Sequence, residues 1–350
     1  MDNRRIIYID NIKAYACIMV VLQHVATYGY IYVGTGAWSD YWVCNISDDS
    51  NYIVNVILIT IAKTAVPLFV MVNGALMLNK DLSWEKIFSK YIVRCIKILL
   101  FWNFFMSICT FMDGGTINDV LSVFVFGYQQ FWFLYTLIGL YVMQPLLRAI
   151  VKQDNLLKVM IYFFVILSVM ETLEVFLPVK LGKNIHHLLE LLGFSDMPKW
   201  CGYYCLGFYL YKNELNIKIS YMFMFCLIAL VSVVWSVVMS SKNSIFVLES
   251  IEVFTLSTLF ISVLIWCLFK RVFNTKYLWS FSIINKESFF IYAIHCLLIE
   301  IALSNHISLD LINMFGLEVI IVTIGIICIS IMMKTFIINH FGFLKRFCEW

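Results

Sequence analysis

The sequence contains few charged residues and very little proline. Only 13% of its 350 residues are charged and only 4 are proline, whereas 62% are hydrophobic and 17% are aromatic. The mean hydropathy is +0.88, and soluble globular domains usually carry about 25% charged residues. This composition excludes an ordinary soluble domain and indicates a protein whose main solvent is lipid.

The chain also lacks a large excess of either charge. Its formal net charge is +3, and its basic residues are scattered among apolar segments instead of forming a stripe. A basic stripe is the usual sign of nucleic-acid binding, so we expect no nucleic-acid partner. No internal repeat, low-complexity tract or proline- and glycine-rich linker divides the sequence. We therefore expect residues 1–350 to form one integral membrane domain without an appended soluble domain.

Cysteine is not scarce, but its spacing does not fit a metal site. None of the 11 cysteines forms a Cys-x-x-Cys pair, and most of them lie inside apolar runs. Cys201 and Cys205 stand one helical turn apart, but no second pair matches them, whereas structural zinc sites take four ligands. The sequence therefore predicts packing thiols, no metal and no bound cofactor.

Long apolar runs dominate the chain instead. A helix needs about 20 mainly apolar residues to cross the hydrocarbon core. The sequence predicts ten such segments, of which the sixth is the least apolar: 11–32, 52–78, 92–112, 129–150, 156–177, 197–211, 217–239, 250–273, 282–303 and 311–338. We expect an all-α, polytopic transmembrane bundle of about ten spans.

The positions of Lys and Arg indicate an orientation, because basic residues are retained on the cytoplasmic side of a membrane. With the N-terminus inside, Lys63 falls within the second span. The external basic residues are then Lys180, Lys183, Lys199 and Lys242, and the rest of the 25 basic residues lie on or near the cytoplasmic face. We expect both termini to be cytoplasmic.

Two ionisable residues lie on the first predicted helix. Ionisable side chains at membrane depth usually face a polar cavity or a partner. Lys13 and His24 are eleven residues apart, so they share one helix face, with His24 about 16 Å deeper. A histidine exchanges a proton near neutral pH, and a cation below it can hold an anionic substrate. The pair therefore resembles a donor channel that leads to a base, although a histidine that only hydrogen-bonds between helices also fits.

Further polar residues lie inside or near the other spans. Tyr292 and His295 share a face of the ninth segment, where they form either a reactive group or a structural tie between helices. Lys63 is interpreted as a counter-charge in the core. Glu171 and Glu174 lie near the outer end of the fifth segment, where they either bind hydroxyls of an external acceptor or simply reach water.

Basic residues recur at helical spacing where the third segment begins. Lys90, Arg94 and Lys97 form a basic face that suits phosphates. The tendency of cations to stay on the cytoplasmic side explains the same residues without any ligand. Both interpretations remain open from this segment alone.

Several motifs occur in a familiar order along the chain. A basic residue, Lys13, precedes His24 with ten residues between them, in a helix that opens at Arg5. The stretch from Val66 to Gly74 reads VPLFVMVNG, and a basic segment runs from Lys90 to Arg94. The later motifs are Phe131-Trp132-Phe133-Leu134 through Tyr141 to Pro145, Tyr204-Cys205-Leu206-Gly207, and Tyr292-Ala293-Ile294-His295.

This pattern resembles the acyltransferase-3 family of bacterial integral membrane acyltransferases, which O-acylate cell-surface sugars and related acceptors. Three positions depart from the family pattern. Lys13 replaces the usual arginine, which loses the planar bidentate fork. Asn73 stands where serine is commoner, and only Arg94 matches the Arg-x-x-Arg motif, since Tyr91 holds its first position.

The resemblance implies a donor and an acceptor on opposite sides of the membrane. Acyl-CoA, most often acetyl-CoA, is expected to enter from the cytoplasm, and a hydroxyl of a cell-surface sugar, glycolipid or related acceptor reacts at the outer side. The chain would then be an O-acetyltransferase of the bacterial cytoplasmic membrane, in contact with membrane lipid.

The same resemblance suggests roles for individual residues. His24 is expected to act as general base, in preference to a transient acyl carrier. Lys13, Lys90 and Arg94 would hold the donor, and Trp132 would line its channel. The expected supporting polar residues are Asp10, Asn73, Tyr292 and His295.

Two other classes of function remain open. A secondary transporter or exporter of a sugar-containing or lipid-linked molecule also places ionisable residues within the membrane. Inverted repeats would favour a transporter, and none is evident in the sequence. A non-enzymatic sensor or scaffold is the third possibility.

Overall fold

The computed structural model describes residues 6–31, 50–215, 218–243, 247–275, 279–304 and 315–348. Throughout these ranges the secondary structure is helical and no strand occurs, which confirms the all-α prediction. Arg5, which opens the first motif, lies outside the described residues. The cytoplasmic location of both termini stays a prediction.

The helices follow the predicted apolar segments closely. They are α1 (Ile7–Ile31), α2 (Ser50–Ala62), α3 (Ala65–Met77), α4 (Trp84–Lys86), α5 (Val93–Met112), α6 (Ile117–Phe126), α7 (Trp132–Val151), α8 (Asp154–Phe176), α9 (Val179–Leu191), α10 (Asp196–Lys212), α11 (Ile219–Asn243), α12 (Leu256–Val272), α13 (Trp279–Ser304), α14 (Phe315–His340) and α15 (Lys345–Cys348). Short elements between them are the π-helix η1 (Ile87–Ile92) and the 3-10 turns η2 (Gln129–Phe131), η3 (Glu249–Ile251) and η4 (Gly342–Leu344).

Eight helical segments in the described part of the chain are long and apolar enough to cross a membrane. They match all the predicted segments except 11–32 and 197–211. The structure forms helices in these two segments as well, α1 with 25 residues and α10 with 17. The protein is therefore a polytopic helical membrane protein.

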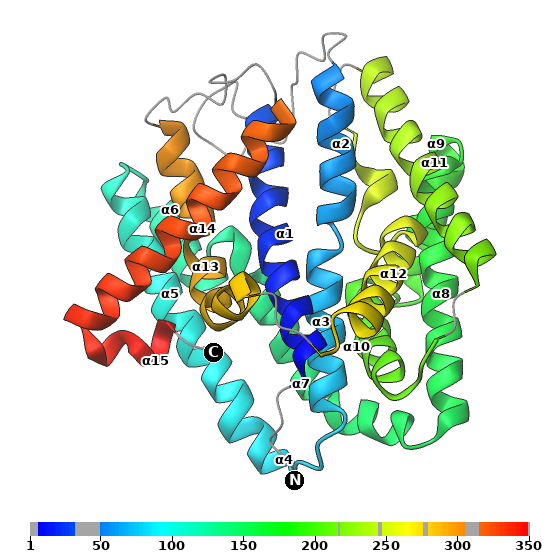
Figure 1. Cartoon of the computed structure of the whole chain (residues 1–350), viewed down its shortest axis with the longest axis horizontal. Helices are drawn as coiled ribbons and strands as arrows, with labels where there is room; N and C mark the ends of the chain where they lie inside the picture. Colours follow the sequence, from blue (N-terminus) through cyan, green and yellow to red (C-terminus); the bar gives the residue numbers. More distant parts are fainter. Residues whose placement is uncertain are drawn as a thin grey trace.

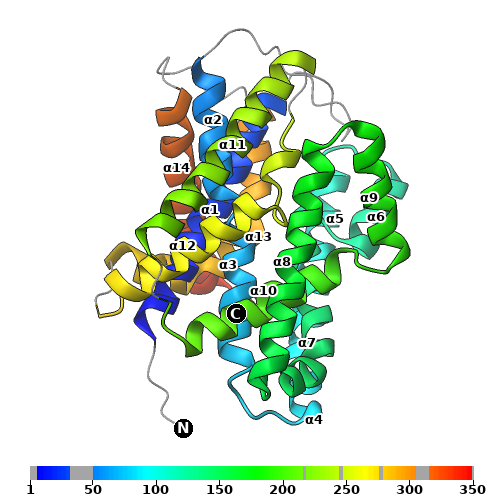
Figure 2. The same ribbon diagram turned by 90° about the vertical axis from the view of Figure 1, so that its right-hand side faces the viewer.

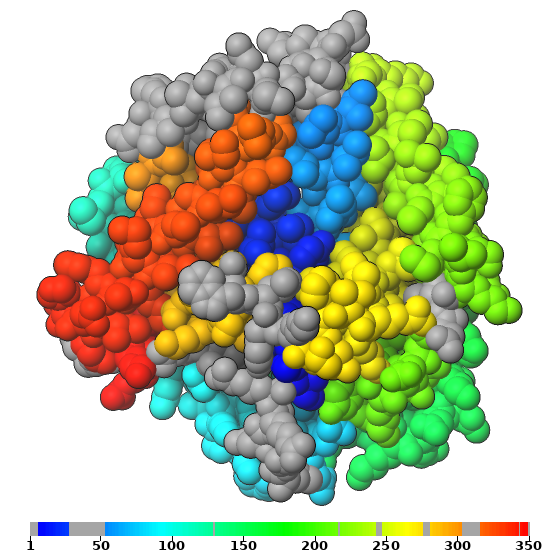
Figure 3. Space-filling view, in the orientation of Figure 1, coloured from blue at the N-terminus to red at the C-terminus, as the bar shows by residue number. Residues whose placement is uncertain are grey.

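Helix α1 occupies the centre of the bundle (Figure 1). It packs against α2, α3, α12, α13 and α14. In Figure 1 the lower end of the bundle holds α4 and the start of α1, and the upper end holds the start of α2. The space-filling view shows that a strip of α1 stays uncovered between α2, α12 and α14 (Figure 3). The central helix is therefore reachable from one side.

The second predicted span is broken into α2 and α3 at Lys63 and Thr64. Pro67 explains the break, since its ring has no N–H to donate to the carbonyl of Lys63 and would clash with it in a continuous helix. The hydroxyl of Thr64 instead donates a 2.6 Å hydrogen bond to the carbonyl of Ile61. The backbone at Thr64 stays in the right-handed helical region, with φ −70° and ψ −12°, so α2 and α3 form one bent span, Ile53–Met77.

Helices α3 and α10 meet backbone to backbone. A Cβ placed on Gly74 would lie 1.9 Å from the carbonyl oxygen of Tyr204, and a Cβ on Gly207 would lie 2.0 Å from that of Met71. Real Cβ atoms do not approach so closely. Two motifs that are far apart in the sequence thus form one contact, and the contact needs glycine on both sides.

Candidate active site

His24 of α1 and His295 of α13 lie side by side, and their ring centroids are 5.0 Å apart. His24 is partly exposed, whereas His295 is fully buried. Nδ1 of His295 lies 2.7 Å from the carbonyl oxygen of Tyr292. A carbonyl only accepts, so Nδ1 carries the hydrogen and Nε2 keeps its lone pair when the ring is neutral. The structure thus brings together the two histidines that the sequence singled out.

A charged pair lies close to the two histidines, at the break between α2 and α3. Nζ of Lys63 is 2.6 Å from Oε1 of Glu252, in the segment that precedes α12. Lys63 is also near enough to His24 to interact with it electrostatically. The sequence predicted a counter-charge role for Lys63. It did not identify Glu252 as the partner, because the two residues are far apart in the chain.

Tyr292 fixes the turn before α7 against α13. Its hydroxyl donates a hydrogen bond to the carbonyl of Gln130, and Nε2 of Gln130 donates one to the carbonyl of Ala293 at 3.0 Å. These two bonds hold η2, and with it Trp132 at the start of α7, beside the turn of α13 that carries His295. Sequence reasoning missed Gln130, although a glutamine beside an aromatic run in an apolar segment is a signal that could have identified it.

A row of aromatic side chains extends from His295 to α10. Neighbouring ring centroids are 6.2 Å apart for His295 and Tyr292, 6.1 Å for Tyr292 and Phe133, 6.3 Å for Phe133 and Trp132, and 5.7 Å for Trp132 and Trp200. Trp132 is 44% exposed. Its role in lining a donor channel stays a prediction.

Polar contacts between α3 and α7 lie on the lower side of the histidines. The hydroxyl of Tyr141 donates a 3.2 Å hydrogen bond to Oδ1 of Asn73, and Nε2 of Gln144 donates one of 3.0 Å to the carbonyl of Met77. Asn73 thus has a defined structural role at the position where the family more often has serine. These bonds align one face of α7 with α3.

A basic depression of about 250 Å³ opens at the lower end of the bundle. Its charged lining residues are Lys80, Asp81, Arg148, Lys152 and Lys212. Asp81 accepts a hydrogen bond from Arg148, which leaves the three lysines in excess. We call this region the basic pocket.

Lys90 contributes to the same region of positive charge. Burial, followed by the charge of Lys90, lowers the pKa of Lys80. Lys90 itself lies on η1 and stays exposed, as does Arg94 on α5. The sequence predicted the basic segment. It missed the basic pocket, because its residues come from three separate parts of the chain.

Lys13 lies below His24 on the same helix, as predicted. Its Nζ is 4.0 Å from Oδ1 of Asp10, one turn earlier on α1. The two residues form a small charged group near the lower end of the bundle. Eleven residues of helix separate Lys13 from His24, which corresponds to about 16 Å along the axis.

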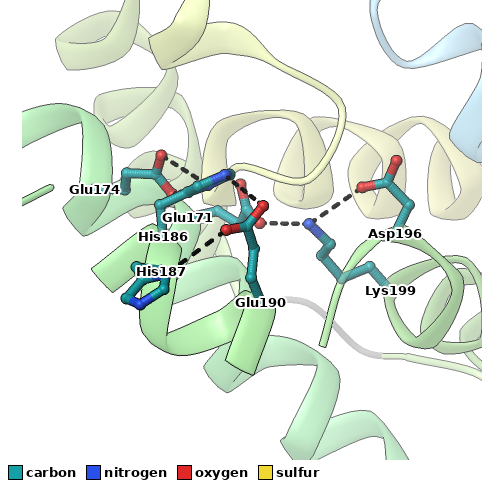
Figure 4. Close-up of polar contacts among 7 residues, drawn as sticks. All are labelled: Glu171, Glu174, His186, His187, Glu190, Asp196 and Lys199. Atoms are coloured by element: carbon teal, nitrogen blue, oxygen red, sulfur yellow. Dashed lines mark hydrogen bonds and ion pairs between the residues drawn. The ribbon is translucent and has the colours of Figure 1, made fainter. Parts of the chain in front are cut away.

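Glu171 and Glu174 belong to a different group, at the other end of α8 (Figure 4). Glu171 accepts a hydrogen bond from Lys199, which is buried and also lies 3.4 Å from Asp196. Glu174 lies 3.2 Å from Nδ1 of His186 on α9. With His187 and Glu190, these side chains form what we call the α9 cluster. Helix α9 has only 13 residues and lies alongside α8 (Figure 2).

Apart from Asp10 and Asn73, the predicted site residues thus fall into three groups. The central group contains His24, His295, Tyr292 and Trp132, the lower group contains the basic residues, and the α9 cluster contains both glutamates. The aromatic row reaches the α9 cluster, because Trp200 is 4.6 Å from Phe254, and Nζ of Lys199 lies 4.5 Å from the centroid of that ring. The central group therefore lies between a cationic end and a cluster rich in carboxylates.

Comparison with known proteins gives one match. A family model described as an acyltransferase domain, Acyl_transf_3, matches residues 6–335. The comparisons with curated proteins and with solved structures found no significant match. The matched region is essentially the whole chain and contains all three groups of site residues. The chain therefore belongs to the acyltransferase-3 family and is a multi-pass membrane acyltransferase.

Proposed function

We propose that this acyltransferase moves an acyl group, most simply acetyl, from acyl-CoA to a hydroxyl of a cell-surface sugar, glycolipid or related acceptor. The observation that carries the proposal is the pair formed by His24 and His295, located between the basic lower end and the α9 cluster. We further propose that the lower end faces the cytoplasm of a bacterial cell.

The donor is an anion with several phosphates, so cations should hold it. Lys90 and Arg94 were expected to do this, and Lys80, Lys152 and Lys212 of the basic pocket add to the same field. Charge-assisted contacts to phosphate are stronger than neutral hydrogen bonds. The thioester end of the donor would then extend upward past Asn73 and Trp132 to His24.

His24 acts in this proposal as the general base. Its ring nitrogen removes the proton from the acceptor hydroxyl as the oxygen attacks the thioester carbonyl. The resulting oxyanion collapses, the carbon–sulfur bond breaks, and the CoA thiolate takes the proton back from His24. Lys63 supplies positive charge near the developing oxyanion, which is the arrangement that favours such a transition state. His295 and Tyr292 hold the adjacent turn of α13 and η2 in position beside His24.

The test compares wild-type protein with His24→Ala and His24→Gln, each purified in detergent and incubated with labelled acetyl-CoA and lipid-linked sugar extracts. We expect both variants to insert and fold but to lose at least about a hundredfold in product formation, since a positioned base contributes about 10²–10⁴-fold. Product formation near the wild-type rate in either folded variant would contradict the role of His24.

One observation favours a second candidate, export of a sugar-containing or lipid-linked molecule. The turn between α2 and α3 carries a charged pair, and ionisable residues inside the membrane often mark transport pathways. Proteoliposomes distinguish the two functions. Movement of a labelled glycolipid across the bilayer without acyl-CoA would indicate export, and acylated product without net movement would indicate transfer.

A further inference from the structure

We propose that His24, His295 and Cys296 form a binding site for a divalent transition metal ion, with Zn²⁺ as the best fit, and that the bound ion blocks acyl transfer. The ligand atoms of these three residues all lie within 4.8 Å of one another. The site joins α1 to α13, so no spacing motif in the sequence reveals it. The inhibitory part rests on the proposed function, whereas metal binding can be tested without it.

The distances suit zinc. Zinc binds nitrogen at about 2.0–2.1 Å and sulfur at about 2.3 Å, so two ligand atoms of a tetrahedral site lie about 3.3–3.6 Å apart. Nε2 of His295 and Sγ of Cys296 are already 3.4 Å apart. A shift of about 1 Å would bring the nitrogen of His24 to the same spacing. Two imidazoles and a thiolate are ligands that zinc prefers to harder cations.

The hydrogen bond of His295 already holds its ring in the orientation and tautomer that metal binding needs. A metal-binding histidine almost always donates its other ring hydrogen to a carbonyl or carboxylate. His295 has this arrangement, because Nδ1 lies 2.7 Å from the carbonyl of Tyr292, which turns Nε2 toward Cys296. The ring is therefore oriented before any ion arrives. Three protein ligands also leave the fourth position of zinc open to water or substrate.

The charge balance is acceptable for a buried site. Binding displaces the thiol proton of Cys296 to solvent, so the ion and its ligands carry one net positive charge. Glu300 lies one helical turn beyond Cys296 and near enough to interact with it electrostatically. Lys63 is an opposing positive charge near His24, and its ion pair with Glu252 partly offsets it. His24 is only partly buried as a residue, so we expect the ion to enter on its side.

Metal binding and acyl transfer would both use the ring nitrogen of His24. A nitrogen of His24 that coordinates the ion cannot accept the proton of an acceptor hydroxyl. Zinc should therefore inhibit acyl transfer at low concentration, and a chelator should restore it. Cys296 has no part in the transfer chemistry proposed above, so Cys296→Ser should keep the basal activity while the ion binds less tightly.

The direct test uses Co²⁺ as the probe on purified, metal-free, full-length protein. Coordination by a thiolate gives a sulfur-to-cobalt charge-transfer band, and we expect one Co²⁺ per chain, displaced by Zn²⁺. Cys296→Ser should lose this band and bind at least about tenfold more weakly. Cys205→Ser is the matched control, since it removes a buried thiol that lies one turn from Cys201, and it should behave as wild type.

The outcomes separate the two parts of the proposal. An unchanged cobalt spectrum in Cys296→Ser, or loss of the band in Cys205→Ser, would overturn the metal site whatever the protein catalyses. Cobalt binding at Cys296 together with activity that Zn²⁺ does not reduce would overturn the inhibitory role. Loss of Zn²⁺ sensitivity in Cys296→Ser, with basal turnover retained, would support both parts. His295→Ala provides a second binding variant, measured by the cobalt spectrum alone.

Discussion

Nζ of Lys63 lies 2.6 Å from Oε1 of Glu252, and this ion pair joins the break between α2 and α3 to the segment that leads into α12. The side chain of Lys63 is 11% exposed, whereas that of Glu252 is 47% exposed. The charged form of Lys63 therefore depends on the pair more than the charged form of Glu252 does. Lys63 has little access to water, so its charge relies on Glu252 for compensation.

Glu252→Gln is therefore expected to be more damaging than Lys63→Met. Removing one partner of a fully buried pair costs about 3–5 kcal/mol, and partial exposure reduces this to about 1–3 kcal/mol here. Thermal unfolding in detergent measures the effect, and the double variant should be more stable than Glu252→Gln alone. Equal stability of all three variants and wild type would show that the pair contributes nothing.

Gly74→Ala should separate α3 from α10. The added methyl would overlap the backbone of Tyr204, and backbone cannot move aside as a flexible side chain can. We expect a loss of at least about 1–3 kcal/mol, as for other overpacked contacts, measured as a fall in unfolding temperature and in yield of monodisperse protein. Gly325→Ala is the control, because nothing lies within 4 Å of its Cβ on α14, and it should leave stability unchanged or slightly raised.

Lys152→Ala and Lys212→Ala should weaken donor binding without changing the chemical step. Each removes one cation from the basic pocket, so KM for acyl-CoA should rise by about 3- to 10-fold while kcat stays near wild type. Steady-state kinetics at low and high salt provide the measurement, and salt should reduce the difference. Lys183→Ala, on α9 at the opposite end, is the matched control. A rise in KM for that control as large as for the other two would argue against a specific pocket.

Variants of the α9 cluster should distinguish carboxylates that stabilise the fold from carboxylates that bind the acceptor. Lys199 is buried against Glu171, so Lys199→Met should lower the unfolding temperature markedly. Glu174 is paired with His186, whose side chain is 56% exposed, so Glu174→Gln should be well folded. If Glu174 binds the acceptor, its variant raises KM for the acceptor and leaves KM for acyl-CoA unchanged. A change in donor KM instead would assign Glu174 to another role.

The sequence predicted the helices well because hydrophobic run length is a local property. Segment 52–78 was correctly predicted as one span, but the prediction did not include the turn at Lys63 and Thr64, which Pro67 signals. Lys13 and His24 were placed correctly relative to each other, since helix geometry alone determines that relation. The pairing of His24 with His295 was expected only as part of a family pattern.

Other parts of the site depend on contacts between distant segments, which no local pattern encodes. Glu252 beside Lys63 and Cys296 beside His24 are examples. The basic pocket is another, because Lys80, Lys152 and Lys212 look like ordinary cations near helix ends. Their significance depends on how the helices are arranged, so only the folded structure reveals it.

The contacts of Gly74 with Tyr204 and of Gly207 with Met71 also limit how the enzyme can move. Two helices whose backbones already touch cannot slide or rotate past each other without a clash, so α3 and α10 must travel together as one rigid unit. If the acceptor is a sugar, as proposed, it would have to enter by displacing helices other than these two. On the proposed function, we therefore propose that a lipid-borne acceptor enters at the lateral face, where a strip of α1 stays uncovered between α2, α12 and α14, and not at the α3–α10 side.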